Sequence, residues 1–178
     1  KKFGTHSLYK VANGDYGFTG TRSYTNFTVT GWHQSTKLGQ GDRYFQGLFG
    51  NQTTGQLLTS EYSSNFYLGL QYGSFSSGNG QNTDKYIANA SGCPTLSNNT
   101  WFHFAWTRDG TDIRLYVNGT LVASNGSVGS IVHSTANTFI GAESGGTVPE
   151  AGRYYNGSIS DVSIWNKALY QSEIKNTM

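Results

Sequence analysis

The sequence predicts an all-β chain that folds into a sandwich of two antiparallel sheets. Three Asx-Gly dipeptides divide its C-terminal half into short segments, at Asp109-Gly110, Asn118-Gly119 and Asn125-Gly126. Asx-Gly supplies the positive φ angles that type I′ hairpin turns require, so these segments are expected to fold back antiparallel. Between the first two dipeptides every second residue is apolar, at Ile113, Leu115 and Val117. This period of two predicts a strand with one buried and one solvated face, and hence a meander.

Length and composition indicate a single domain over residues 1–178. A chain of 178 residues suits one all-β sandwich and buries roughly 70% of the surface that its unfolded form exposes. Cys93 is the only cysteine, which excludes an intrachain disulfide and a metal site built on several thiolates. Because the chain starts at Lys1 directly in strand-like sequence, we expect it to be excised from a longer protein.

Further strands and one helical turn are expected in chain order. Aromatic and β-branched residues cluster between Gly-, Ser- and Asn-rich loops, which predicts strands at residues 6–11, 26–34, 44–49, 66–72 and 86–89. Residues 171–176 are the one helical candidate, with Leu169 and Ile174 as anchors against a sheet. The core is expected to contain Ile113, Leu115, Val117, Val162 and Ile164.

Charge and hydropathy exclude two classes of partner. Twelve basic and ten acidic residues leave a nearly neutral chain, and no run of Lys and Arg interleaves with aromatic residues as a nucleic-acid groove requires. No apolar stretch approaches the roughly 20 residues that span a bilayer. Neither nucleic-acid binding nor membrane insertion is therefore expected.

Several motifs together carry a family resemblance. They are Phe27-Thr-Val-Thr-Gly-Trp, Trp101-x-His-Phe-Ala-x-Thr-Arg-Asp-Gly, Leu115-Tyr-Val-Asn-Gly and Gly157-x-Ile-x-Asp-Val-x-Ile-Trp-Asn-x-Ala-Leu. In this order they resemble the laminin G-like and pentraxin-like branch of the concanavalin A-like lectin/glucanase superfamily. The resemblance implies a jelly roll with one concave sheet and functional loops along one rim. The family usually caps its last short helix with Ser or Thr, where this chain has Tyr170.

A glycosidase needs two carboxyl groups, about 5 Å apart in retaining enzymes. The four glutamates have no second carboxylate two to five residues away: Glu61, Glu143, Glu150 and Glu173. Asp109 and Asp112 flank a predicted hairpin turn and are interpreted as structural. Of the Tyr, His, Arg and Gln set that the resemblance implies for lyases, only His33-Gln34 is recognisable. The chain is therefore predicted not to be an enzyme, with a glycan hydrolase or lyase as the less favoured alternative.

Two polar residues in the family motifs are interpreted as structural, and Ca²⁺ binding is left as an alternative. The resemblance implies a hydrogen-bonded imidazole at His103 and a satisfied carboxylate near a sheet edge at Asp161. Relatives also hold Ca²⁺ on a loop rim with Asp and Asn oxygens. The loop acids here are scattered, at Asp15, Asp42, Asp84 and Asp109, so Ca²⁺ is an open alternative with no ligand set assigned.

Tyrosine is the best functional indication in the sequence. Of the 178 residues 26 are aromatic and 12 of these are Tyr, whose ring stacks on a sugar while its hydroxyl hydrogen-bonds. Tyr44 and Tyr72 are expected at strand ends beside polar loops, where ligands enter. Asp42 and Arg43 are expected to hydrogen-bond sugar hydroxyls or a carboxylated sugar.

We therefore predict a non-catalytic recognition domain of an extracellular or virion-surface protein that binds glycan or a surface glycoprotein. The alternative is an adhesion or assembly domain that docks on protein, including other chains of a larger assembly, and has no sugar site.

Overall fold

The computed structural model describes residues 8–10, 17–21, 26–36, 45–51, 55–62, 65–72, 85–88, 97–125, 137–144 and 148–178. Within these ranges it describes the side chains of residues 26–36, 97–124, 139–142, 148 and 154–178. The described part consists of β-strands, turns and one short helix, as the sequence predicts.

One layer is a six-stranded sheet. In spatial order its strands are β1 (Leu8–Lys10), β14 (Gly157–Trp165), β3 (Phe27–Ser35), β8 (Phe102–Asp109), β9 (Asp112–Val117) and β10 (Thr120–Asn125). All neighbouring pairs in this sheet are antiparallel. The last three strands form the predicted meander.

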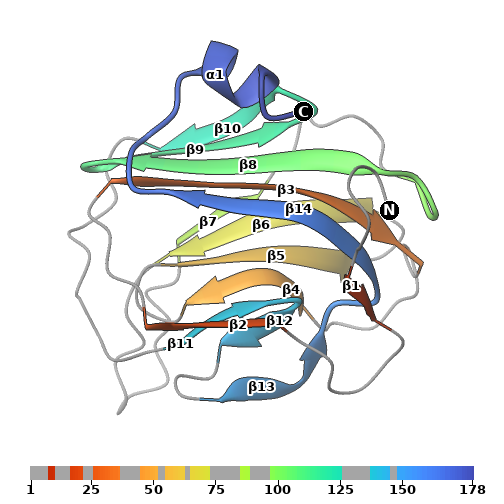
Figure 1. Ribbon diagram of the computed structural model, residues 1–178. Helices are drawn as coiled ribbons and strands as arrows, with labels where there is room; N and C mark the ends of the chain where they lie inside the picture. Colours follow the sequence, from red (N-terminus) through yellow and green to blue (C-terminus); the bar gives the residue numbers. More distant parts are fainter. Residues whose placement is uncertain are drawn as a thin grey trace.

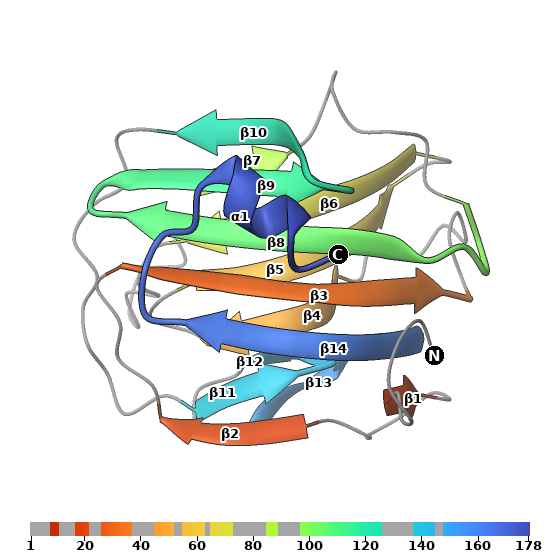
Figure 2. The ribbon, with the colours of Figure 1, turned by 45° about the horizontal axis from the view of Figure 1, so that its top comes forward.

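The other layer is an eight-stranded sheet. Its main path runs through β12 (Ala142–Ser144), β13 (Pro149–Tyr154), β4 (Phe45–Asn51), β5 (Gly55–Tyr62), β6 (Asn65–Tyr72) and β7 (Lys85–Ala88). Off this path β11 (Asn137–Ile140) pairs with β4 and with β2 (Gly17–Thr21). The β13–β4 pairing is parallel and the others are antiparallel. Figure 1 shows the two layers, and Figure 2 shows the six-stranded sheet in front of the other.

The core lies between the two sheets. Its buried side chains come mainly from β3, β8, β9 and β14: Phe27, Val29, Phe102, Phe104, Trp106, Ile113, Leu115, Val117, Tyr155 and Ile159. The predicted core residues Ile113, Leu115 and Val117 are among them. Val162 and Ile164 are only partly buried but pack against this cluster. The core prediction is therefore confirmed, except that these two residues are less deeply buried than expected.

The hairpin turns differ from the prediction at one position. Asn118 and Gly119 have φ angles of 49° and 70° and connect the pair Val117 and Thr120, as a type I′ turn requires. Asp109, however, pairs with Asp112 at the end of the ladder. The central residues of that turn are therefore Gly110 and Thr111. Of these two residues, only Gly110 has a positive φ, which is the pattern of a type II′ turn. Asn125-Gly126 extends beyond the described residues.

Strand β9 is covered on both faces, whereas alternation predicted one wet face. Its inner positions are fully buried as expected, but Tyr116 on the opposite face is only 5% exposed. Asp112 and Arg114 are half-buried. The cover comes from helix α1 (Gln171–Lys175), which lies over β8 and β9 in Figure 2.

Candidate functional site

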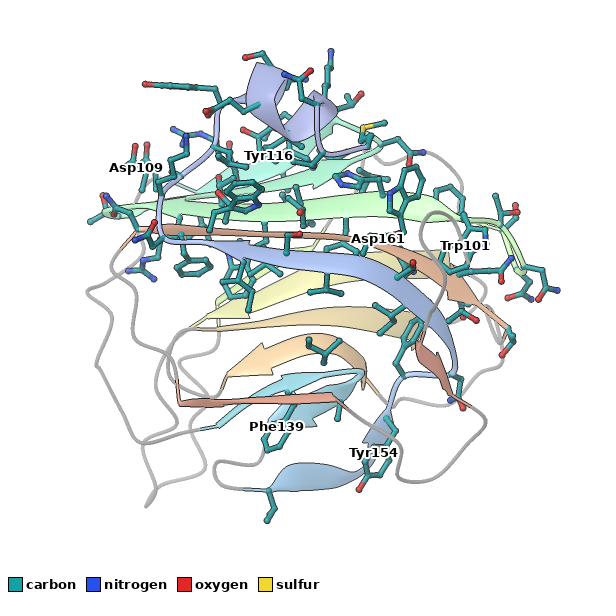
Figure 3. The ribbon with its side chains drawn as sticks, in the orientation of Figure 1. Trp101, Asp109, Tyr116, Phe139, Tyr154 and Asp161 are labelled. Carbon is teal, nitrogen blue, oxygen red and sulfur yellow. The ribbon has the colours of Figure 1, made fainter. Side chains whose placement is uncertain are left out.

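On the outer face of the six-stranded sheet, positions of β8 and β9 are covered by the chain's own C-terminal segment, defined as residues 166–178. Leu169 and Ile174 of this segment form a buried cluster with Ala105 of β8 and Tyr116 of β9. The predicted helical turn and both of its predicted anchors are thus confirmed. Figure 3 shows Tyr116 beneath the helix. The segment removes these outer positions of β8 and β9 from contact with a ligand.

Two polar side chains attach this segment to the sheet. The Thr28 hydroxyl of β3 donates to the Lys167 carbonyl and accepts from the Leu169 N–H, both at 2.8 Å. The Gln171 side-chain amide donates to the Gly119 carbonyl in the β9–β10 turn, also at 2.8 Å. These bonds satisfy backbone groups of both the C-terminal segment and the β9–β10 turn. The segment is therefore an integral part of the sandwich.

His103 lies under the end of the C-terminal segment. Its Nε2 is 3.2 Å from the Thr177 hydroxyl, and its ring packs edge-on against Trp32 with centroids 5.2 Å apart. The side chain is only 1% exposed, and this burial lowers the pKa of His103 to about 4. The imidazole is therefore neutral and shielded, which supports the structural interpretation over a role as ligand or base.

His33 is buried on the opposite face of the same sheet. Its Nδ1 lies 2.9 Å from the Tyr155 hydroxyl between the two sheets. Burial, with a smaller contribution from His103, lowers the pKa of His33 to about 3, and burial raises the pKa of Tyr155. The neighbouring Gln34 donates to the Asn99 carbonyl at 2.7 Å. The His33-Gln34 fragment therefore has structural contacts and does not form an open lyase-like group.

Two of the three described aspartates, Asp112 and Asp161, have side-chain partners. Asp109 and Asp112 face each other across the β8–β9 turn, and Arg114 Nη2 lies 2.8 Å from Asp112 Oδ2. Asp161 is exposed in a bulge of β14, has a φ of 52°, and accepts a 2.7 Å hydrogen bond from the Ser160 hydroxyl. In Figure 3 Asp109 lies at one end of the six-stranded sheet, and Asp161 lies away from it, within β14. Neither belongs to a carboxylate pair suited to glycoside cleavage.

No metal centre is found in the described part of the chain. There, no group of three or more His, Cys, Asp and Glu side chains could hold a metal ion. Asp15, Asp42 and Asp84 lie outside the described residues, as does Cys93.

The two faces of the eight-stranded sheet follow from its register. Ile140 of β11 packs against the cluster between the sheets and pairs with Phe49 of β4, which pairs with Leu57 of β5. The row continues to Leu70 of β6 and Ile87 of β7. Residues paired directly across strands belong to the same face, so this apolar row belongs to the inner face.

The alternate positions of β5, β6 and β7 belong to the outer face and are called the polar face. Gln56, Gln71 and Tyr86 form one row across it. Ser60 and Tyr67 form a second row, four residues along β6 and hence on the same face. The outer set also contains Leu58, and the row of Gln56 continues through Gly50 to Phe139, whose side chain is buried. Because Gln and Tyr residues adjoin across β5, β6 and β7, we take the polar face of these three strands as the candidate ligand surface.

Of the four predicted site residues, only Tyr72 lies in the described part of the chain. Asp42, Arg43 and Tyr44 lie outside the described residues; β4 begins directly after them at Phe45. Tyr72 is the last residue of β6 and pairs with Lys85, which confirms its place at a strand end. Since β4 and β6 are both antiparallel to β5, they run parallel to each other. The start of β4 and the end of β6 are therefore at opposite ends of the sheet.

The sequence analysis assigned no role to Tyr67 or Tyr86. Alternation along β6 separates Tyr67, on the polar face, from Tyr72, which occupies the face of Leu68 and Leu70. The alternation of Tyr67, Gly69 and Gln71 with Phe66, Leu68 and Leu70 was visible in the sequence. The order of the cross-strand rows depends on how the strands pair, and that pairing was not visible in the sequence.

Comparisons with known proteins agree with this architecture. The protein family described as the concanavalin A-like lectin/glucanases superfamily matches residues 10–175. No curated protein sequence matches the chain.

Solved structures share the fold at low identity. A heptameric SAP-like pentraxin from Limulus polyphemus is 20% identical, with a TM-score of 0.67 over 95% of this chain and 78% of that one. Domain 4 of an extracellular arabinanase from Geobacillus stearothermophilus, in complex with arabinotriose, is 15% identical, with a TM-score of 0.63 over 93% and 82%. The carbohydrate-binding module of a Ruminococcus gnavus sialidase, bound to α2,3-sialyllactose, is 14% identical, with a TM-score of 0.59 over 86% and 83%.

No helix in the described ranges has the length and apolar character needed to cross a membrane.

Proposed function

The chain belongs to the laminin G-like family of the concanavalin A-like lectin/glucanase superfamily, and on that basis we propose that it is a non-catalytic domain that binds glycan. The observation that carries the proposal is the contrast between its two outer sheet faces. The C-terminal segment covers outer positions of β8 and β9 in the six-stranded sheet, whereas the strand register places rows of Gln and Tyr on the outer face of β5, β6 and β7. Tyr and amide side chains are suited to stack on and hydrogen-bond sugar rings.

Structural neighbours support the same function. Two domains of this fold were solved with bound saccharides, arabinotriose in one and α2,3-sialyllactose in the other. Because the identity to both is low, they support a class of ligand and leave the particular glycan open. We propose Asp42, Arg43 and Tyr44, which precede β4 in the sequence, as additional contacts to the glycan. Tyr72 has a register position on the inner face of the sheet, and it is proposed as a contact at the rim, where β6 ends.

The burial and location of the described polar groups favour a recognition role over catalysis. His33 and His103 are buried with strongly lowered pKa values, and the described aspartates lie in turns and a bulge. A general acid or base has to reach its substrate. We propose that the domain acts on an extracellular or virion surface, where its glycan is displayed on a host cell, matrix or surface glycoprotein.

The proposal is tested by a glycan array followed by calorimetric titration of each hit. Tyr44→Ala and Tyr72→Ala are each expected to weaken binding by about 1–3 kcal/mol, as loss of an aromatic anchor does. The control is Tyr170→Ala, which removes a 78% exposed Tyr from the C-terminal segment and should leave the affinity unchanged. Titration with Ca²⁺ and with EDTA shows whether the metal contributes.

Absence of binding to any glycan contradicts the glycan-binding function and favours the protein-docking alternative. If glycan binds but Tyr44→Ala and Tyr72→Ala match the wild type, the function stands and the two rim assignments are wrong.

A further inference from the structure

We propose that His103 makes the C-terminal segment acid-sensitive: when this imidazole takes up a second proton, the segment leaves the outer face of β8 and β9. This role is independent of glycan binding. It follows from the hydrogen bond that the ring makes, from the ring nitrogen that has no partner, and from the charged groups on the elements around the ring.

The Thr177 hydroxyl determines which ring nitrogen of His103 carries the proton. This hydroxyl donates to the Ile174 carbonyl at 2.7 Å, and a hydroxyl has only one proton to give. Toward His103 Nε2, 3.2 Å away, the hydroxyl is therefore the acceptor. The neutral ring thus carries its proton on Nε2 and donates it to the last turn of the C-terminal segment.

The other ring nitrogen, Nδ1 of His103, is buried and has no hydrogen-bond partner. A second proton would turn it into a charged N–H donor that faces neither an acceptor nor water, which is costly. Protonation therefore requires that the ring reach solvent. Strand β3, whose Trp32 packs on the ring, has paired strands on both sides, whereas the segment is held by a few side-chain contacts. The segment is the element that moves.

The C-terminal segment supplies no counterion for a charged His103. Its basic residue in the last helical turn is Lys175, a cation that repels an imidazolium. Its carboxylate, Glu173, is paired with Lys167 at 2.7 Å and also accepts from the Tyr170 N–H. A proton on His103 therefore weakens the contact between the segment and the sheet.

The strands beside His103 supply no counterion either. His33 of β3 is bonded to a hydroxyl on the opposite face, and burial keeps its pKa at about 3, so it is neutral. Tyr116 of β9 is a neutral phenol, because burial raises its pKa. On β14 Asp161 is exposed and accepts from the Ser160 hydroxyl. No carboxylate in the described ranges bonds to the His103 ring.

The size of the effect follows from proton linkage. In the closed form burial lowers the pKa of His103 to about 4, whereas an exposed imidazole titrates near 6.5. The closed form is thus fully stable above about pH 7 and loses stability as the pH falls toward 4. Between pH 7.5 and 5 these two pKa values raise the opening constant about 30-fold. Glu173 stays ionised in this range, because its bond to Lys167 lowers its pKa from 4.5.

Amide hydrogen exchange at pH 7.5, 6 and 5 tests the proposal, with protection factors that correct for the intrinsic pH dependence of exchange. The reporters are the N–H groups of Leu169, bonded to Thr28, and of Thr177, bonded to the Ile174 carbonyl. From pH 7.5 to 5 the protection of both should fall about 30-fold. The amides between β3 and β8 should stay better protected, because the segment opens locally.

His103→Gln removes the titrating group and should reduce this change to less than about twofold, with thermal melting to show that the variant is folded. Glu173→Gln is the matched control, because glutamine can also accept in a capping box but does not titrate. It should keep the wild-type pH response.

Three exchange results would overturn the proposal: a wild-type response in folded His103→Gln, a response lost in Glu173→Gln, or equal loss of protection across the whole sheet. A second measurement needs no variant. Long-range nitrogen–proton correlation in the NMR spectrum should find the His103 proton on Nε2 at pH 7, and a proton on Nδ1 would overturn the proposal even if His103→Gln fails to fold.

Discussion

The hydroxyl of Thr28 and the backbone N–H of Leu169 form a 2.8 Å hydrogen bond although the two residues are 141 positions apart in the sequence. The same hydroxyl donates to the Lys167 carbonyl. One side chain of β3 thus fixes the point at which the chain leaves β14 and crosses the outer face of the six-stranded sheet. This closure removes the outer positions of β8 and β9 from contact with a ligand.

Thr28→Val is expected to lower the free energy of unfolding by about 1–3 kcal/mol. The substitution keeps the shape of the side chain but leaves the buried Leu169 N–H without its acceptor. Urea denaturation followed by circular dichroism measures the change. Thr120→Val, at an exposed position of β10, is the control and should alter stability by less than about 0.5 kcal/mol. Equal effects in the two variants would contradict the role of the Thr28 hydroxyl.

The two turn glycines should respond differently to a methyl group. Gly110 has a φ of 58° and open space where a Cβ would lie, so Gly110→Ala should cost only the backbone strain of a positive φ, about 1–3 kcal/mol. At Gly119, with a φ of 70°, the added Cβ would stand 2.9 Å from Lys175 Cγ and 3.0 Å from Met178 Sδ. Gly119→Ala should therefore cost more and loosen the helix. Comparing the two melting temperatures tests this, and a smaller loss in Gly119→Ala would contradict the packing of the C-terminal segment on the turn.

Tyr170→Ser is expected to stabilise the protein. Tyr170 precedes α1 at the N-cap position, where its backbone N–H donates to Glu173 Oε2 at 2.8 Å, and its ring is largely exposed. Serine supplies a side-chain oxygen that accepts from the first turn of a helix, a contribution of about 0.5–1 kcal/mol. Thermal melts of Tyr170→Ser and Tyr170→Ala separate the new hydrogen bond from the loss of the ring. Equal stabilities of these two variants would show that serine does not cap the helix.

Acidification below about pH 6.5 should destabilise the fold. Burial keeps the pKa of His33 at about 3 and that of His103 at about 4 in the folded protein, whereas both titrate near 6.5 when unfolded. The unfolded chain therefore takes up protons first, so stability is flat above about pH 7 and falls between about pH 6.5 and 4. The slope is up to roughly 1.4 kcal/mol per pH unit for each histidine.

Urea denaturation at several pH values from 8 to 5 measures this slope, above the range in which most carboxylates titrate. His103→Gln should reduce the slope by about half, because one of the two lowered pKa values is removed. An undiminished slope in this variant would contradict the neutral state assigned to His103.

The sequence predicted local features of the fold well. Alternation at Ile113, Leu115 and Val117 marked β9 and its buried face because a strand repeats every two residues. Alternation did not predict β5, because the adjacent residues Leu57 and Leu58 break the period of two. The cover over Tyr116 was also missed, because a helix that packs on a strand from 55 positions further along leaves no trace in the strand's own period.

The candidate site shows the same limit. Tyr72 was correctly placed at a strand end from the loop that follows it. Its face and its distance from the start of β4 depend on how β4, β5 and β6 pair, and pairing is a long-range property. The polar face became recognisable only when Gln56, Gln71 and Tyr86 were aligned across three strands.

The most direct test of the central claim is to map backbone amide chemical shifts in the NMR spectrum while a glycan identified on the array is titrated. We expect the shifted amides to cluster in β5, β6 and β7, with those of β8, β9 and the C-terminal segment unmoved. A cluster of shifts over α1 and its supporting strands, or no shifts with any array hit, would contradict binding on the polar face.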